Sequence, residues 1–146
     1  MKRSTQIIWW GLRIILGVLM LLGALTHVTN AKEGAMADNA FITAMVNTGY
    51  LWPIIGAIEL LAGAAILAGR FVPLALVVLA PITLNILLFH LSQPMHPDGI
   101  GIALAIILPH LGLAWLYRHS FSSLLKLNTS IVDVPTAPEA INSRAG

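Results

Sequence analysis

Three polar side chains, Glu59, Asn85 and His110, stand inside long apolar stretches of this sequence. A carboxyl, an amide and an imidazole can each form hydrogen bonds, and the carboxyl and the imidazole can also exchange protons. Such groups are costly inside a membrane, and they usually face the interior of a helix bundle. We therefore take them as the first candidates for a ligand-binding or proton-handling site.

Three further candidates lie in or beside the same stretches: Arg13, His27 and His90. Each has a structural alternative. Arg13 can pair with Glu59 or extend its long side chain to the membrane surface, and the two histidines are easily tolerated near a membrane surface. Asn85 can serve as a hydrogen bond between helices, and His110 can do the same.

The composition shows what must position these residues. Hydrophobic residues make up 58% of the 146 residues and charged residues only 10%, whereas soluble domains carry about 25% charged residues. A bilayer core needs roughly 20 apolar residues per helix. Four segments meet this requirement: residues 7–28, 51–68, 71–91 and 100–117. We therefore predict an all-α fold, a transmembrane antiparallel four-helix bundle.

The connections refine this prediction. Between the first two spans, Asp38-Asn39 precedes an apolar run that ends near Gly49, which predicts a short capped helix lying at the membrane interface. Residues 128–146 show no periodicity and predict a flexible cytoplasmic tail. The membrane domain is thus expected to cover residues 1–127.

The basic residues predict the orientation. Lys2, Arg3, Arg70, Arg118 and Lys126 fall on one side of a four-span arrangement, and only Lys32 falls on the other. The positive-inside rule then places both termini in the cytoplasm and the chain in the cell (inner) membrane. In this orientation Glu59, Asn85 and His110 lie in the outer half of the bilayer, on three different helices, where they can converge on one pocket that His27 and His90 cap.

Several classes of function are disfavoured. The sequence has no cysteine, which excludes thiolate chemistry and Cys-ligated metals. The net charge of +2 forms no dense basic stripe of the kind that binds nucleic acid. No metal site is predicted, and haem is disfavoured because the depths of His27, His90 and His110 do not match. Recurring glycine and alanine in the first two spans indicate close helix packing and leave a homo-oligomer open.

The order of several short motifs resembles the DoxX family of small four-span membrane proteins. The motifs are Leu12-Arg13 through Gly17, Gly49 through Pro53, Glu59 through Gly63, Gly69-Arg70-Phe71, the third span with Pro81, Asn85 and Phe89-His90, and Ala114 through Arg118. The resemblance extends over about residues 7–127. It implies the four-span fold, Arg13 and Glu59 as a characteristic charged pair, and more loosely a redox role linked to quinone, because the family includes a subunit of an archaeal thiosulfate:quinone oxidoreductase.

Three hypotheses follow, and the sequence leaves open whether the protein is an enzyme. The first is a redox-associated subunit with an intramembrane polar pocket for a quinone or another small hydrophobic ligand. The second is a noncatalytic structural or accessory subunit of a membrane complex, whose polar groups satisfy one another. The third is a small transporter with a polar path past Arg13. The expected partners are the lipid bilayer and other membrane or redox subunits.

Overall fold

A computed structural model describes residues 3–29, 39–92 and 97–122. The described residues form α1 (Arg3–Val28), α2 (Ala40–Asn47), α3 (Leu51–Ala68), α4 (Val72–Ser92), α5 (Pro97–Leu116) and a 3-10 turn at Arg118–Phe121. The tail predicted for residues 128–146 lies outside them. The predicted all-α fold is confirmed, and the predicted short helix in the first connection is present as α2.

Four helices are long and apolar enough to cross a membrane: Gln6–Val28, Leu51–Ala68, Val72–Ser92 and Gly99–Leu116. Their ends lie within a few residues of the predicted ones. Two helices begin earlier than the predicted spans: α1 begins at Arg3 rather than near residue 7, and α5 begins at Pro97 rather than near residue 100. Proline suits the first position of a helix, because its fixed φ is helical and no partner is needed there for the missing N–H.

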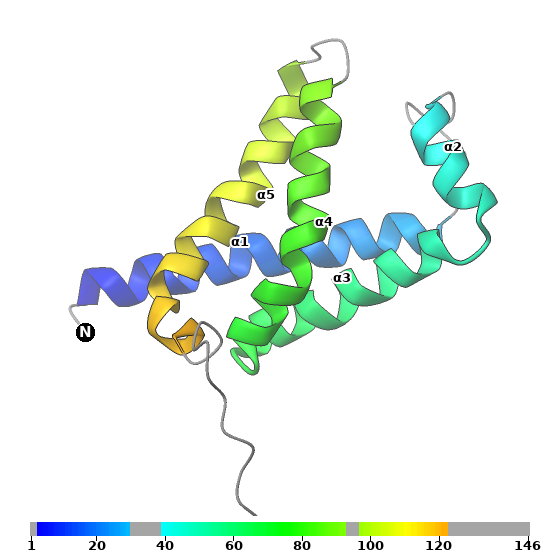
Figure 1. Cartoon of the computed structure of the whole chain (residues 1–146). Helices are drawn as coiled ribbons and strands as arrows, with labels where there is room; N and C mark the ends of the chain where they lie inside the picture. The colour runs from blue at the N-terminus through cyan, green and yellow to red at the C-terminus, as the bar shows by residue number, and fades with distance from the viewer. Residues whose placement is uncertain (1–2, 30–38, 93–96, 123–146) are drawn as a thin grey trace, which may run out of the picture.

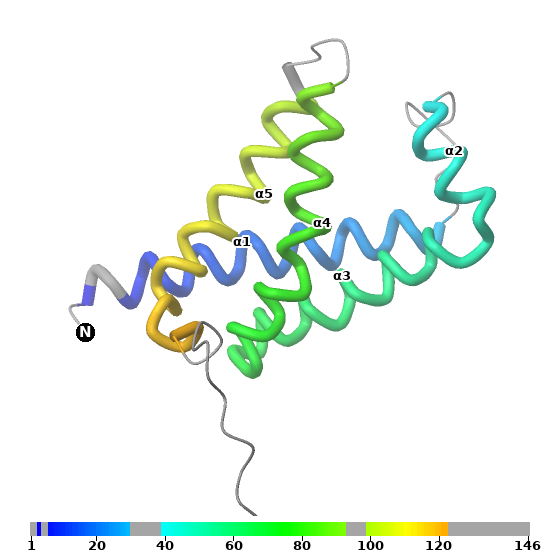
Figure 2. The backbone as a smooth tube through the Cα atoms, viewed as in Figure 1, coloured from blue at the N-terminus to red at the C-terminus, as the bar shows by residue number. Residues whose placement is uncertain are grey.

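The helices form two pairs, α1 with α3 and α4 with α5, which are joined most closely at one end of the molecule (Figure 1). That closed end contains the start of α1, the end of α3, the start of α4 and the end of α5. There Trp9 Nε1 donates a hydrogen bond to the Tyr117 hydroxyl at 3.0 Å. Toward the other end, which we call the open end, the two pairs diverge, as the backbone trace in Figure 2 shows.

Glycines bring α1 and α3 together. A Cβ atom on Gly63 would lie 3.0 Å from Cβ of Met20 and 3.1 Å from the carbonyl oxygen of Gly17. A Cβ on Gly17 would collide with the side chain of Leu67. Since the hydrophobic effect does little to hold helices together in lipid, this close backbone approach supplies van der Waals contact instead. It also fixes which residues of α1 face α3.

The apolar core lies between the closed end and the middle of the bundle. Leu16, Ile66, Leu79 and Leu113 are fully buried, and Met20 is only 1% exposed. They come from all four long helices, and they leave the open end without a comparable core. The polar residues near the open end are therefore positioned around a gap between the helix pairs.

Candidate functional site

A cavity of about 310 Å³ occupies the open end, and all five helices contribute to its lining. We call it the central cavity. Its walls are mainly apolar, and three aromatic residues, Phe41, Trp52 and Phe89, stand among them. Phe41 of α2 lies against Phe89 of α4, with 5.5 Å between the ring centroids. The short helix α2 thus contributes directly to the cavity wall.

Residue Asn39 gives α2 a defined start. The Asn39 side chain accepts hydrogen bonds from the backbone N–H groups of Phe41 at 3.0 Å and Ile42 at 3.2 Å. This is the helix cap that the sequence predicted, and it satisfies two donors that the first turn of a helix leaves free. Ile42 is buried, so the capped helix turns an apolar side toward the rest of the protein.

Glu59 is the buried acid of the central cavity. Glu59 is only 3% exposed, and its Oε2 has no hydrogen-bond partner among the described residues. A buried polar atom without a partner is uncommon and costs about 1–3 kcal/mol. Oε2 is therefore a hydrogen-bonding group that lines a cavity and that the described protein leaves unsatisfied.

His27 lies nearest to this carboxyl, with 3.4 Å between Nδ1 and Glu59 Oε2. The same Nδ1 is 2.8 Å from the carbonyl oxygen of Gly23. Because a carbonyl can only accept, Nδ1 carries the proton and donates it to Gly23. His27 therefore lies close to Glu59, but its Nδ1 proton is donated to the Gly23 carbonyl and not to the carboxyl. The imidazole also packs on Trp52, at 4.2 Å between the ring centroids.

Asn85 is the second polar group that faces the cavity without a partner. The residue is exposed, it lines the central cavity, and no described residue forms a hydrogen bond with its amide. At 100° per residue it lies between lipid-exposed Leu88 and cavity-lining Phe89 on α4. Asn85 therefore stands at the rim, where the cavity meets the outer surface of the bundle. His90 also lines the cavity, one turn nearer the end of α4.

The structure separates His110 from this group. The side chain is buried, and its Nδ1 lies 3.3 Å from the Thr83 hydroxyl in a hydrogen bond between α5 and α4. Thr83 is two residues before Asn85, so on a helix the two point about 160° apart. His110 thus meets the side of α4 opposite to the rim, and the structure does not bring it to Glu59 and Asn85 at the central cavity. Thr83, which the sequence analysis missed, is its partner.

Arg13 is also elsewhere, at the closed end. Its guanidinium donates to the carbonyl oxygens of Ile66 at 2.8 Å and Leu67 at 2.7 Å, the last turn of α3. Its Cζ lies 4.3 Å from the ring centroid of Trp9 and 4.6 Å from that of Trp10. The carbonyl end of a helix carries partial negative charge, so it stabilises this buried cation without a carboxylate.

The expected pair of Arg13 and Glu59 does not form. Glu59 lies beside Gly23, where an added Cβ would come within 2.8 Å of Oε2. Gly23 is ten residues beyond Arg13 on α1, a rise of about 15 Å. Fully buried Leu16 and nearly buried Met20 lie between them on the same helix. The two charged residues therefore serve different ends of the bundle.

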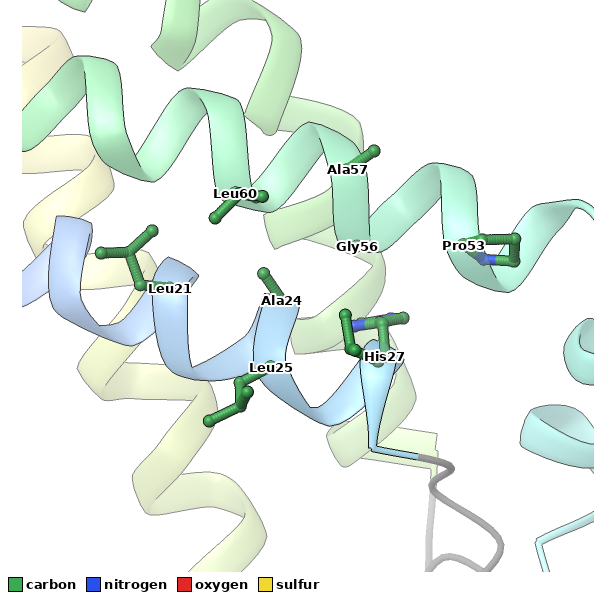
Figure 3. Close-up of a pocket in the computed structure, with 9 residues that line it drawn as sticks. Leu21, Ala24, Leu25, His27, Pro53, Gly56, Ala57 and Leu60 are labelled. Atoms are coloured by element: carbon green, nitrogen blue, oxygen red, sulfur yellow. The ribbon is translucent and has the colours of Figure 1, made fainter.

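A second hollow, of about 410 Å³, follows the outer side of the α1–α3 pair (Figure 3). Figure 3 shows Leu21 and Leu60 at one end of it and Pro53 toward the other, with Ala24, Gly56 and Ala57 between. His27 is the one titratable side chain among the nine residues that line it. This groove is larger than the central cavity, but Glu59 and Asn85 are absent from its lining, so the central cavity is the better candidate site.

Comparison with known proteins places this architecture in a family. No curated protein and no solved structure matches the chain. The family model described as DoxX matches residues 8–91, from the start of α1 to the end of α4, which is more than half of the chain. The match includes Glu59, Asn85, His27 and His90, together with Arg13 at the closed end, and it stops before α5. The chain is therefore a multi-pass membrane protein that belongs to the DoxX family.

Proposed function

We propose that this protein binds a small hydrophobic ligand, such as a quinone, in the central cavity, and that it does so as a redox-associated membrane subunit. The observation that carries the proposal is Glu59 Oε2, which is buried, lines the cavity and has no hydrogen-bond partner among the described residues. Ligand sites are mostly apolar hollows with a few polar groups that fix the ligand's orientation. The redox part rests on the family resemblance.

The chemistry of the lining suits a planar polar head. Phe41, Trp52 and Phe89 supply aromatic surface against which a ring can pack. Glu59 accepts a hydrogen bond when ionised and donates one when protonated, and the Asn85 amide does both. The carbonyl oxygens of a quinone ring only accept, so a protonated Glu59 carboxyl and the Asn85 amide N–H are the groups that would donate to them. A volume of about 310 Å³ lies at the small end of the range for ligand pockets, about 300–1,000 Å³.

The two alternatives find less support in the described residues. An accessory subunit without a ligand predicts polar groups that satisfy one another, as Thr83 and His110 do, but Glu59 and Asn85 do not. A transporter predicts a polar path from Glu59 past Arg13. Buried apolar side chains, among them Leu16, Met20 and Ile66, occupy the bundle between the two.

The replacement Glu59→Met tests the proposal, because methionine is unbranched and can donate no hydrogen bond to a quinone oxygen. We expect the bundle to assemble and the binding of decylubiquinone to protein in nanodiscs to weaken by about fivefold, as expected when a neutral hydrogen bond of about 1 kcal/mol is lost. Thr83→Val is the matched control, since it removes a buried polar group outside the cavity. Equal binding by wild type and Glu59→Met would show that the carboxyl does not hold the ligand.

We also propose that the protein lies in the cell inner membrane with its closed end and both termini on the cytoplasmic side. Arg70 at the end of α3 and Arg118 after α5 support this, since both stand at the closed end. A fluorescent-protein fusion to the C-terminus folds only in the cytoplasm, whereas alkaline phosphatase is active only outside it. We expect the fluorescent-protein fusion to fluoresce and the phosphatase fusion to be inactive. The reverse result would contradict the orientation.

A further inference from the structure

A groove lies along the contact between α3 and α4. This groove has a volume of about 200 Å³ and is lined by residues of these two helices and of the turn that joins them. Buried Ala62 and Ala75 are among its lining residues, whereas Leu61, Leu74 and Val78 are 71%, 61% and 41% exposed. We call this groove the α3–α4 seam. It is open to the surroundings along the outside of the bundle.

The helical register shows that the seam and the central cavity follow one another. On α4, Val78 of the seam and Asn85 of the cavity are seven residues apart, which places them on one face two turns apart. On α3, Ile55 of the cavity precedes Ile58 of the seam by three residues, which is a neighbouring position on the helix surface. On both helices the seam therefore lies next to the cavity, on the side of the closed end.

The chemistry changes along this path. The cavity holds the unpartnered Glu59 carboxyl and the Asn85 amide, whereas every residue that lines the seam is apolar. Figure 1 shows α3 and α4 diverging from their shared turn toward the open end. From Ile55 to Ala65 the path extends about 15 Å along α3, which is half of a bilayer core of about 30 Å.

We propose that the ligand is an amphiphile with one hydrocarbon tail, whose polar head binds at Glu59 and Asn85 and whose tail lies in the α3–α4 seam. This rests on the proposed function, since the head site is the central cavity. The head reaches the cavity sideways from the lipid, past Asn85, and the tail never has to leave an apolar environment. The seam is a single groove between two helices, so it takes one chain.

The test compares two probes: decylubiquinone and the same benzoquinone without its tail. Ala65→Phe fills the seam, because Ala65 lines it and is half-buried. Ala64→Phe is the matched control, because Ala64 is exposed and lines neither the seam nor the cavity. We expect Ala65→Phe to weaken binding of the tailed quinone by about tenfold, the effect of overfilling a packed groove, and to leave the tailless quinone unchanged. Equal effects on both probes, or on neither, would overturn the tail site.

The two proposals fail in different ways. Loss of the head site through Glu59→Met weakens both probes, whereas Ala65→Phe weakens only the tailed one. If neither quinone binds wild type, the quinone head is wrong, and native mass spectrometry of the protein purified from membranes tests the tail. The tail site is supported if a single-tailed amphiphile is bound to wild type and to Ala64→Phe but not to Ala65→Phe. A two-tailed phospholipid, or no bound molecule, contradicts it.

Discussion

The position of Arg13 predicts that it holds the fold together and takes no part in ligand binding. The substitution Arg13→Met keeps an unbranched side chain and removes the guanidinium. Leu67 O then loses its hydrogen bond from Nη2, and Ile66 O loses the one from Nε. The Gly69 N–H still donates a hydrogen bond to Ile66 O at 3.1 Å. The substitution therefore affects the carbonyl of Leu67 more than that of Ile66.

The magnitude follows from these contacts. Two hydrogen bonds from a charged donor contribute about 1.5–3 kcal/mol each, and contacts with two indole rings add about 0.5–1 kcal/mol each. The burial of a cation opposes them by several kcal/mol. We expect Arg13→Met to lower the free energy of unfolding by about 3 kcal/mol. Arg13→Lys keeps the charge but not the paired donors, so its free energy of unfolding should lie between those of wild type and Arg13→Met.

Reversible unfolding in mixed micelles, followed by circular dichroism, measures this difference. Ile14→Met is the matched control, since Ile14 is adjacent and 51% exposed, and it should change stability by less than about 0.5 kcal/mol. Decylubiquinone binding should persist in the folded fraction of Arg13→Met. A variant with unchanged stability and lost binding would refute this reasoning and return Arg13 to the ligand site.

Two further predictions concern contacts between helices. Thr83→Val should lower the free energy of unfolding by about 1 kcal/mol, because it removes the hydrogen bond to His110. A double-mutant cycle with His110→Phe measures the coupling between the two residues. Additive effects of the two substitutions would show that the bond contributes nothing. Gly63→Leu should prevent α1 and α3 from approaching, because even a Cβ would lie 3.0 Å from Cβ of Met20. The yield of monodisperse protein measures this, with Gly11→Leu as control, since a Cβ on Gly11 meets nothing within 4 Å; equal yields from both variants would contradict the packing.

The sequence by itself determined the elements of this fold. Long apolar segments bounded by turn residues were sufficient to predict four spanning helices, because hydropathy and helix length are local properties. Local capping was also predictable. Asn39 starts α2 through its own side chain, and Gly69 ends α3 with a φ of 70°, a conformation that glycine adopts at little cost.

The tertiary structure decided which polar residues meet. Helical rise gives the depth of each residue from the sequence, and on depth alone Glu59, Asn85 and His110 form one group. The direction in which each side chain points depends on how a helix is rotated against its neighbours, which the packing of distant residues fixes. Gly17 and Gly63 set that rotation for α1 and α3. His27 thereby lies beside Glu59, while Arg13 binds the end of α3 and His110 turns to Thr83.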